Sequence, residues 1–229
     1  MLLQAALNGP FTKDDHPAMP ITAAELAADA RACVQAGAGA IHMHPRNRWG
    51  EETLDPEVIN AVVREVRAAC GVPVGVSTGA WIEPDHGLKL GYIGAWTEPD
   101  YASVNISEDG WRDVVRALRA NGIGVEAGVW SADDARALRE SGLAGDLTRI
   151  LIEPVDADPA AAGELIAAID AELPDAPRLA HGDGAATWPF IEHAVQRRWD
   201  TRVGLEDTQE ATNPELVARA MSLIKGGSQ

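Results

Sequence analysis

Short apolar runs alternate with longer amphipathic stretches from one end of the chain to the other. Eight such runs are rich in Val, Ile and Ala, and each is followed by a segment whose apolar residues recur with helical spacing. Apolar strands that alternate with helices are typical of a parallel sheet, because helices cover its faces. The predicted strands are Leu2–Asn8, Ala40–Pro45, Pro73–Thr78, Tyr101–Ile106, Ile123–Trp130, Arg149–Val155, Arg178–Gly182 and Thr201–Glu206.

Capping residues mark where the intervening helices begin and end. In Thr22-Ala-Ala-Glu25, the threonine hydroxyl and the glutamate carboxylate are spaced to satisfy each other's free backbone donors. A cap residue also precedes a proline at Asp55 and at Asn213, where proline fits the first helical position. Further helices are predicted to begin at Ser107 and Ser131, with helix ends at Gly37, Gly122 and Gly142.

Eight strand–helix units in one chain predict an α/β fold, a single-domain (β/α)8 TIM barrel over residues 1–229. A doubly wound open sheet is the alternative, because strand positions alone do not give the strand order. Such sheets usually bind a nucleotide at the first strand-to-helix turn, and that turn carries no GxGxxG sequence here. The barrel is therefore favoured.

Composition and charge narrow the classes of partner. The 229 residues are 46% apolar and carry a net charge of −16, which repels phosphate backbones, so nucleic acid is not an expected partner. No apolar run reaches about 18 residues and Met1–Leu7 lacks a basic leader, so neither a membrane span nor a signal peptide is predicted. The only two cysteines, Cys33 and Cys70, suit a reducing compartment, and a cytoplasmic protein is expected.

The second predicted strand ends in Ile41-His42-Met43-His44. Residues two apart on a strand share a face, so the two imidazoles project together at the end where barrel enzymes carry their active sites. Two neutral imidazoles favour a zinc site that needs one further nitrogen or oxygen donor. The alternative is a hydrogen-bonded pair of polar residues at a strand end.

The eighth predicted strand supplies such a donor. Arg202 and Glu206 share one face, and barrel closure would place this strand beside the first strand, next to the histidine strand. Side chains can then converge over the first strand, where Gly9 leaves room. His42, His44 and Glu206 are therefore predicted to bind zinc, and other divalent cations suit the same ligands. Taken alone, a carboxylate at this position would be interpreted as a solvated strand end.

Other strand ends carry hydroxyl and amide groups that can orient a carboxylate or a carbonyl by hydrogen bonding. The alternative interpretation is that they are turn and cap residues. Glu126 lies inside a strand, where an unpaired carboxylate is costly, so it is either the buried partner of an arginine or a site residue. The predicted substrate-binding residues are Asn8, Ser77, Thr78, Ser103, Asn105 and Glu126.

Lysines are too few and wrongly placed for one class of barrel chemistry. The chain has three, Lys13, Lys89 and Lys225, and none lies at a predicted strand end. A Schiff-base aldolase needs such a lysine inside the barrel. Carbon–carbon chemistry here would therefore need a metal ion instead.

The His-x-His of the second strand and the Arg-x-Gly-x-Glu-Asp of the eighth belong to a set of segments that run in order through nearly the whole chain. Taken together, these segments resemble the β-keto acid cleavage enzymes, the family that includes 3-keto-5-aminohexanoate cleavage enzyme. They are Ala5–Gly9, Met19–Thr22, Ala36–Ala38, Ile41–His44, Val76–Gly79, Ser103–Asn105, His181-Gly182 and Arg202–Asp207.

The resemblance implies a zinc-dependent (β/α)8 enzyme that takes a β-keto acid and acetyl-CoA to acetoacetate and a new acyl-CoA. By this analogy the two histidines and Glu206 hold the metal, and Asp207 with Arg202 forms the acid–base pair. Ser77 and Ser103 would line the substrate site. A homo-oligomer is expected as well.

Two positions depart from the family's best-studied type, which uses glutamates there to bind a substrate amino group. Phe11 follows the first strand, and Gly128 occupies the second position, on the fifth strand. A neutral or apolar β-keto acid is therefore expected rather than a cationic one. Arg46 and Arg48, just after the histidine pair, are the predicted contacts of CoA.

Two other functions fit the same residues. A metal-dependent aldolase or hydrolase would use these ligands without CoA, and would turn over with no thioester present. The second is a barrel that binds a metal or a small ligand and catalyses nothing. Arg202 and Asp207 beside the candidate ligands argue against this last function.

Overall fold

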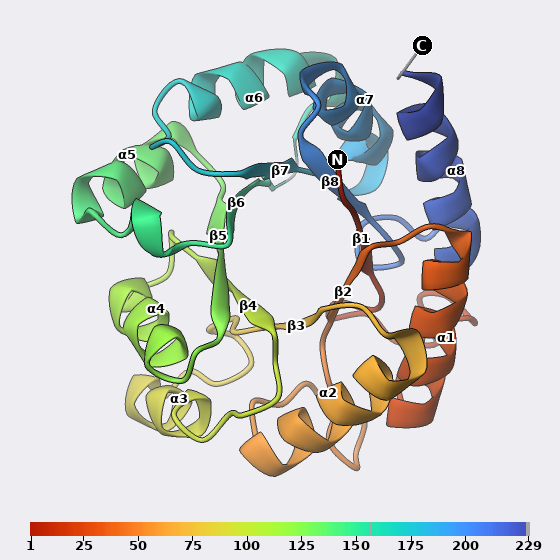
Figure 1. Ribbon diagram of the computed structural model, residues 1–229, viewed down its shortest axis with the longest axis vertical. Coiled ribbons are helices and arrows are strands. Elements are labelled where there is room, and N and C mark those ends of the chain that lie inside the picture. The colour runs from red at the N-terminus through yellow and green to blue at the C-terminus, as the bar shows by residue number, and fades with distance from the viewer. Residues whose placement is uncertain (156, 228–229) are drawn as a thin grey trace.

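Eight parallel strands form one closed barrel, in which each strand pairs with the next and the last pairs with the first (Figure 1). The computed structural model describes residues 1–155 and 157–227. The pairing of first and last strands confirms the predicted barrel and excludes the open sheet. The strands are β1 (Leu3–Ala6), β2 (Ala40–Met43), β3 (Val74–Ser77), β4 (Tyr101–Asn105), β5 (Gly124–Val129), β6 (Arg149–Ile152), β7 (Arg178–Ala180) and β8 (Asp200–Val203).

Helices surround the barrel and alternate with the strands along the chain (Figure 1). This is the strand–helix–strand form that parallel neighbours require. The helices are α1 (Ala23–Ala36), α2 (Pro56–Cys70), α3 (His86–Ile93), α4 (Trp111–Ala120), α5 (Ala132–Ser141), α6 (Ala162–Asp170), α7 (Thr187–Arg197) and α8 (Asn213–Gly226). Short 3-10 helices cover Ala144–Asp146, Pro159–Ala161 and Gly184–Ala186.

Side-chain caps confirm three of the predicted helix starts. Thr22 and Glu25 form the capping box of α1. Asp55 and Ser131 each accept a hydrogen bond from a backbone N–H in the first turn of α2 and α5. These caps satisfy backbone donors that the helix itself leaves free.

Two predicted helix starts are wrong. Thr212 rather than Asn213 is the cap of α8, because the Asn213 side chain is used elsewhere. It donates to the carbonyl oxygen of Leu7 and accepts from the backbone N–H of Leu205, so it ties the chain after β1 to the chain after β8. The helix predicted from Ser107 is α4, which begins four residues later.

The turn after β8 differs from the sequence-based prediction. β8 ends at Val203, so Glu206 lies in a turn and not on the strand. The chain approaches β1 closely here, because a Cβ on Gly204 would overlap the carbonyl oxygen of Ala6. The backbone N–H of Glu206 then donates to that same carbonyl at 3.3 Å. Glu206 therefore reaches the barrel mouth through a tight turn.

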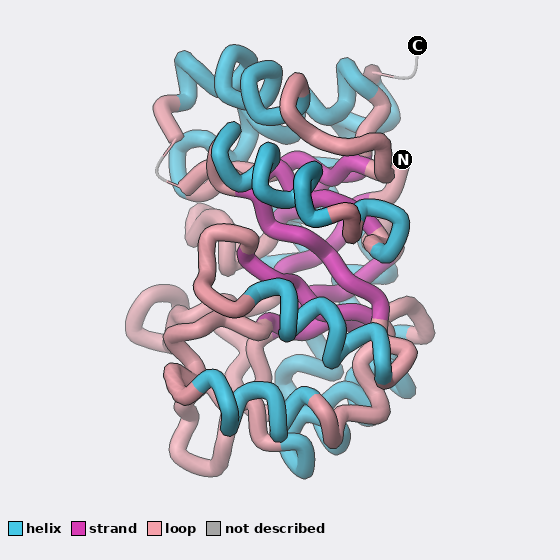
Figure 2. Tube along the Cα trace, turned by 90° about the vertical axis from the view of Figure 1, so that its left-hand side faces the viewer, coloured by secondary structure: helices cyan, strands magenta, loops and turns pink. Residues whose placement is uncertain are grey.

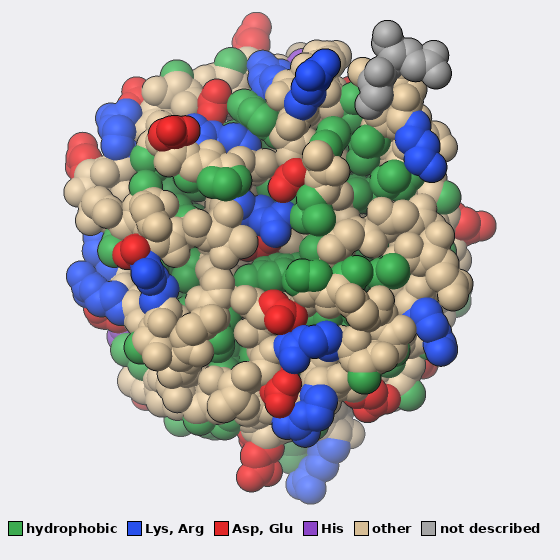
Figure 3. All heavy atoms as spheres, viewed as in Figure 1, with side chains coloured by type: hydrophobic (Ala, Val, Ile, Leu, Met, Phe, Trp, Pro, Cys, Tyr) green, Lys and Arg blue, Asp and Glu red, His purple; other side chains and the backbone are tan. Residues whose placement is uncertain are grey.

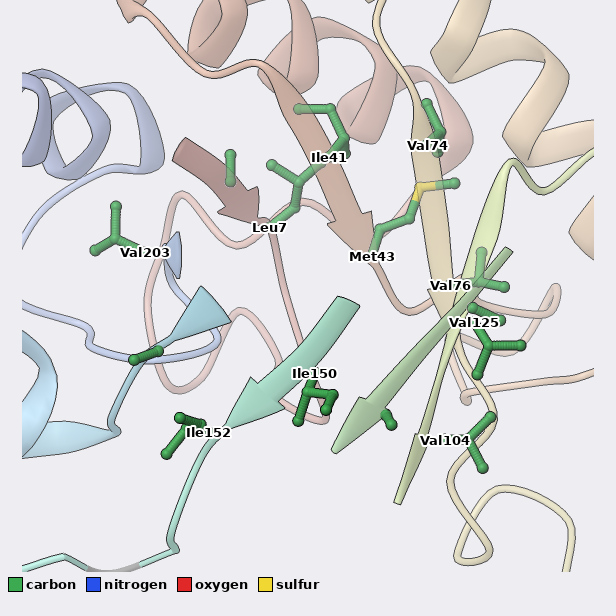
Figure 4. Close-up of a cluster of buried hydrophobic side chains, with 14 of the residues drawn as sticks. Leu7, Ile41, Met43, Val74, Val76, Val104, Val125, Ile150, Ile152 and Val203 are labelled. Carbon is green, nitrogen blue, oxygen red and sulfur yellow. The ribbon is translucent and has the colours of Figure 1, made fainter. Parts of the chain in front are cut away.

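The hydrophobic core lies between the strands and the helices. Side chains that point outward from the strands, such as Ile41, Met43, Val76 and Ile150, are fully buried there (Figure 4). Because side chains alternate along a strand, the residues between them point into the barrel. Ile41 and Met43 thus face the helices while His42 faces the interior, as predicted.

Polar side chains fill one end of the barrel interior. Glu126 is fully buried, and its carboxylate lies 3.1 Å from the Nε of Arg149 and accepts from Gln4 at 2.9 Å. Tyr101 packs over Gly75, where a Cβ would overlap its ring. Burial raises the pKa of Glu126, and Arg149 opposes that rise. Of the two interpretations of Glu126, the structure favours the buried partner of an arginine.

The longer connections lie at the carboxyl ends of the strands. The connection from β1 to α1 covers residues 7–22 and that from β2 to α2 covers 44–55, whereas α1 and β2 are joined by 37–39 alone. Figure 2 shows most of the longer loops on the side of the barrel opposite the N terminus. Barrel enzymes build their active sites from loops at this end.

The surface carries charges of both signs. On the face shown in Figure 3, acidic and basic side chains lie interspersed around the rim. That face is therefore not the uniformly basic surface that nucleic-acid binding requires. Among the helices of the described residues, none has the length and apolar character needed to cross a membrane.

The capping box of α1 should make the stability of the fold depend on pH. Hydrogen bonds from Lys13 and from the backbone of Thr22 and Ile21 lower the pKa of Glu25 from 4.5 to about 2. A lowered pKa stabilises the fold above pH 4.5, and this contribution is lost as the pH falls toward 2. We expect Glu25→Gln to lower the free energy of unfolding at pH 7 by less than about 1 kcal/mol, because the pair is partly solvated.

Reversible denaturant unfolding of both proteins between pH 7 and pH 2.5 measures the effect. The difference between wild type and Glu25→Gln should shrink toward zero as the pH falls, because glutamine still accepts the capping hydrogen bonds. A difference that stays constant across this range would contradict the assignment of the effect to the carboxylate charge.

Candidate active site

Two buried histidines lie at the carboxyl end of β2. His42 pairs in register with Ala6 of β1 and Gly75 of β3, and His44 follows the last residue of the strand. Their Nε2 atoms are 3.2 Å apart, and the rings meet edge to face. Two nitrogens bound to one tetrahedral zinc ion lie about 3.4 Å apart, so this spacing suits a shared cation.

Glu206 reaches the histidines from the turn after β8. Its Oε1 lies 3.5 Å from the Nε2 of His44, and its Oε2 lies 3.7 Å from the Nε2 of His42. Gly9 makes this approach possible, because a Cβ there would stand 2.5 Å from the Cγ of Glu206. Gly9 also has a φ of +52°, which favours glycine.

The three side chains fit a divalent cation. Their ligand atoms all lie within 4.8 Å of one another. The buried Oε2 of Glu206 has no hydrogen-bond partner among the described residues, and a bound cation would provide one. Two imidazole nitrogens and one carboxylate oxygen also leave a coordination position open, as catalytic zinc sites do.

The surroundings set the charge of each of these groups. Burial lowers the pKa of His42 to about 3, so its imidazole is neutral and can donate a lone pair. Burial opposes charge on His44 too, but Glu206 and Glu52 raise its pKa to about 9. Burial would raise the pKa of Glu206, yet Arg202 and the two histidines hold it well below its ordinary value. A cation at this place would therefore replace the proton of His44.

Glu52 orients His44 from the loop between β2 and α2. Its Oε1 lies 2.5 Å from the Nδ1 of His44, and this contact leaves the Nε2 of the ring free to face Glu206. Its Oε2 accepts a hydrogen bond from the indole of Trp81 at 3.1 Å, and that indole stacks on the His44 ring. A carboxylate behind a metal-binding histidine fixes the tautomer of the ring.

Arg202 binds two carboxylates at once. Its Nη2 lies 2.7 Å from the Oδ1 of Asp207 and 2.9 Å from the Oε1 of Glu206, and its Nε donates to Asp207 at 3.1 Å. Burial raises the pKa of Asp207, and Arg202 opposes that rise. The two residues of the predicted acid–base pair are thus in contact, directly beside the candidate metal ligands.

A cavity of about 260 Å³ opens over these groups. It is just smaller than the ~300–1,000 Å³ of typical drug-sized ligand sites, which suits a small organic acid. Its walls combine the candidate ligands and acid–base pair with polar strand-end residues and aromatic side chains. The lining residues are Pro10, Phe11, His42, His44, Ser77, Trp81, Ser103, Asn105, Trp130, Glu153, Pro154, Val155, His181, Gly182, Asp183, Arg202, Glu206 and Asp207.

Comparison with known families agrees with this geometry. The model of the beta-keto acid cleavage enzymes matches residues 1–227. The chain belongs to this family. The resemblance stated from sequence segments is therefore confirmed.

Two curated relatives match part of the chain. The 3-keto-5-aminohexanoate cleavage enzyme of Fusobacterium nucleatum is 36% identical over 81 residues, which are 34% of this chain and 30% of that protein. The 3-oxoadipate:acetyl-CoA acetyltransferase of Cupriavidus necator is 34% identical over 80 residues, 34% of this chain and 28% of that protein. The aligned part thus spans less than a third of the length of either relative.

Solved structures share the barrel. Apo ObcA superposes with a TM-score of 0.71 at 15% identity, over 93% of this chain and 63% of that chain. The 3-dehydroquinate dehydratase of Geobacillus kaustophilus gives 0.69 at 11% identity, over 98% and 90%. At such identities the likeness concerns the fold alone.

Three of the six predicted substrate-binding residues of this family member line the cavity. They are Ser77 and Asn105, the last residues of β3 and β4, and Ser103, in the middle of β4. Asn105 donates its amide to Glu108 at 2.8 Å, and Glu108 is paired in turn with the buried Lys89 at 3.1 Å. The Asn105 side chain is therefore held in place from behind.

The other three predicted residues lie outside the cavity lining. Asn8 donates to the carbonyl oxygen of His44 and accepts from its backbone N–H, so it holds the backbone of a candidate ligand. Thr78 donates its hydroxyl to the carbonyl oxygen of Ser103 at 2.7 Å. Glu126 is bound to Arg149 in the interior, as described above.

A second cluster in the cavity contains Glu153, which was not singled out from the sequence, and His181, which appeared there only as part of a segment of the family resemblance. The Nε2 of His181 lies 2.6 Å from Glu153, and the indole of Trp130 donates to the other oxygen of that carboxylate at 3.2 Å. A Cβ on Gly128 would overlap the Glu153 carboxylate, so an acidic group fills this space from the neighbouring strand. Glu153 directly follows β6, as His181 follows β7, and the strand-end argument applied to β6 would have singled out Glu153 as well.

Neither predicted CoA contact lines the cavity. Arg46 is buried, and its guanidinium donates to the carbonyl oxygens of Gly9 and Phe11. It thus braces the loop after β1. Arg48 is exposed, with its guanidinium 4.1 Å from the centre of the Trp49 ring. A contact of Arg48 with CoA stays a prediction.

Replacing a candidate ligand tests the metal site. We expect His42→Ala to weaken zinc binding more than about 100-fold, since even partners behind the ligands contribute 10- to 100-fold. The fold should be largely kept, because the barrel is closed by backbone pairing. Equilibrium zinc titration and circular dichroism measure the two effects, with His193→Ala on the outer helix α7 as the control. Unchanged zinc affinity would rule out His42 as a ligand.

The space at Gly9 gives an independent test. We expect Gly9→Ala to weaken zinc binding at least tenfold, because the added Cβ displaces Glu206 and the positive φ is strained. Gly184→Ala has a similar φ of +50° and nothing near its Cβ, so it reproduces the strain without the clash. If both variants bind zinc with equal affinity, the space that Gly9 leaves for Glu206 does not contribute to zinc binding.

Proposed function

We propose that the chain is a zinc-dependent β-keto acid cleavage enzyme, with the barrel as its single catalytic domain. It would convert a β-keto acid and acetyl-CoA into acetoacetate and a new acyl-CoA. The carbon between the keto and carboxylate groups bonds to the acetyl carbonyl carbon, and its bond to the original acyl carbon breaks. CoA leaves the acetyl group and ends on the released acyl group, so atoms and charge balance.

One observation carries this proposal. The His42, His44 and Glu206 group lies directly beside the Arg202–Asp207 pair, in one cavity. Enolate chemistry needs such a combination, an electrophile for the carbonyl oxygen and a base for the adjacent carbon. Membership of the family supports the reaction class, as does the acetyltransferase name of the Cupriavidus relative.

Asp207 would remove the proton from the substrate carbon. Burial raises its pKa, which makes the carboxylate a stronger base than an exposed aspartate. Arg202 holds the carboxylate through two nitrogens, and this fixes its direction when the substrate arrives. A bound divalent cation would polarise the keto oxygen and so acidify the neighbouring C–H bond.

The cavity favours a β-keto acid whose far end is neutral or apolar. Pro10, Phe11 and Val155 contribute apolar surface to the lining. The Glu153 carboxylate is already bound at both oxygens, by Trp130 and by His181. A substrate ammonium group would have to compete with these contacts.

Isotope transfer tests the reaction. Zinc-loaded protein is given acetyl-CoA with ¹³C at both acetyl carbons and a panel of β-keto acids, and products are identified by mass spectrometry. We expect doubly labelled acetoacetate and an unlabelled acyl-CoA that corresponds to the added acid. Asp207→Asn should lower kcat roughly 10²- to 10⁴-fold with zinc affinity unchanged.

The competing function predicts a different result. A metal-dependent aldolase or hydrolase would cleave the acid in the absence of acetyl-CoA and transfer no label. Cleavage of that kind would contradict the acyl-transfer proposal, while leaving the metal site intact.

A further inference from the structure

His181 is a buried cavity residue with one nitrogen committed and one uncommitted. It directly follows β7 and is 5% exposed. Its Nε2 lies 2.6 Å from the Oε2 of Glu153. Its Nδ1 is buried and makes no hydrogen bond among the described residues. Unpaired buried polar atoms are rare, and in a ligand cavity they point to a partner that arrives with the ligand.

The two carboxylates around the ring favour a hydrogen-bond donor at Nδ1. The Oδ1 of Asp207 lies 3.6 Å from Nδ1, and Glu153 faces the other nitrogen. A lone pair on Nδ1 would point toward the carboxylate oxygen of Asp207, whereas an N–H at this position is directed toward an acceptor. Arg202 lies on the far side of Asp207.

Asp207 does not use the Nδ1 proton. A distance of 3.6 Å is beyond hydrogen-bond range. The Oδ1 of Asp207 already accepts from both the Nη2 and the Nε of Arg202, at 2.7 and 3.1 Å. The donor at Nδ1 is therefore available to a molecule in the cavity.

The rest of the cluster holds His181 in this orientation. The Glu153 carboxylate is bound from its other side by Trp130 and fills the space that Gly128 leaves. The ring thus cannot turn without breaking its contact with Glu153. Donors fixed in advance are the ones that stabilise developing negative charge, since they need no reorganisation.

The proposed reaction involves more than one oxygen that gains negative charge. Both the keto group and the thioester carbonyl are attacked or enolised, whereas the His42, His44 and Glu206 group has one open position. We propose that the Nδ1–H of His181 donates a hydrogen bond to a second substrate oxygen, a carbonyl or carboxylate oxygen that this group does not hold. The inference rests on the proposed function and adds a binding residue to it.

Two isosteric variants separate the two nitrogens. In His181→Asn the amide nitrogen can take the place of Nδ1, and in His181→Gln it can take the place of Nε2. The first variant keeps a donor for the substrate, and the second keeps a donor for Glu153. His193→Asn and His193→Gln, on the outer helix α7, are the matched controls. Zinc affinity and thermal unfolding of all four variants exclude indirect effects.

Binding of acetoacetate and of acetyl-CoA to the zinc-loaded proteins, measured by calorimetry, is the first readout. We expect His181→Gln to weaken one of the two at least tenfold, and His181→Asn to bind both within about threefold of wild type. Weaker binding of acetoacetate would show that the Nδ1–H contacts an oxygen of the keto acid. Weaker binding of acetyl-CoA would show that it contacts the thioester oxygen. The proposal is overturned if neither ligand is affected, or if Asn and Gln weaken binding equally.

Turnover is the second readout and tests the proposed function separately. Removing one charge-stabilising donor typically lowers kcat about 10²- to 10³-fold. We expect that loss in His181→Gln, and a smaller one in His181→Asn. Wild-type protein that binds both ligands but transfers no label would refute the acyl-transfer function, while the binding comparison would still decide the role of His181.

Discussion

One buried guanidinium holds the two halves of the site together. Arg202 is 6% exposed, and it pairs both with Glu206, a candidate metal ligand, and with Asp207, the proposed base. Leaving a buried charge without its partner costs about 3–5 kcal/mol, so the guanidinium and the carboxylates depend on one another. The distance between the candidate cation site and the proposed base is therefore set by a single side chain of β8. Neither can move without disturbing the other.

The cavity is acidic because four carboxylates converge on it. Glu153, Glu206 and Asp207 line the cavity, and Glu52 lies beside it, behind His44. These four residues come from three loops, in a chain with a net charge of −16. The positive charge that balances them comes from Arg202 and from His44, whose pKa is raised to about 9. This charge balance would attract a divalent cation, and it would repel a free carboxylate until such a cation is bound. For the proposed enzyme, the metal would therefore bind before an anionic substrate.

The fold could be predicted from the sequence because each strand and helix has its own local pattern of apolar and capping residues. Eight apolar runs and a set of caps predicted all eight strands, and the His-x-His and Arg-x-Gly-x-Glu-Asp motifs predicted two groups that the structure brings together, the candidate ligands and the contact between Arg202 and Asp207. Asn213 was assigned wrongly as a cap because its real partners, Leu7 and Leu205, are brought near it only by barrel closure. Glu52 was not predicted to belong to the site, because its contact with His44 also depends on how the chain folds. Nothing in its local sequence shows that the loop folds back on His44.

Closure of the barrel places the candidate metal site on its seam. β1 pairs with β8, so residues such as Leu3 and Thr201 become neighbours although almost the whole chain separates them. His42 and His44 lie on one side of this seam and Glu206 on the other. Contacts so distant in sequence carry a large cost in loop-closure entropy, which slows their formation. During synthesis, nearly all of the chain must emerge from the ribosome before Glu206 can contact the two histidines. A cation that needs all three of these ligands could therefore be held only by a closed barrel, and not by a folding intermediate in which β1 and β8 are still apart.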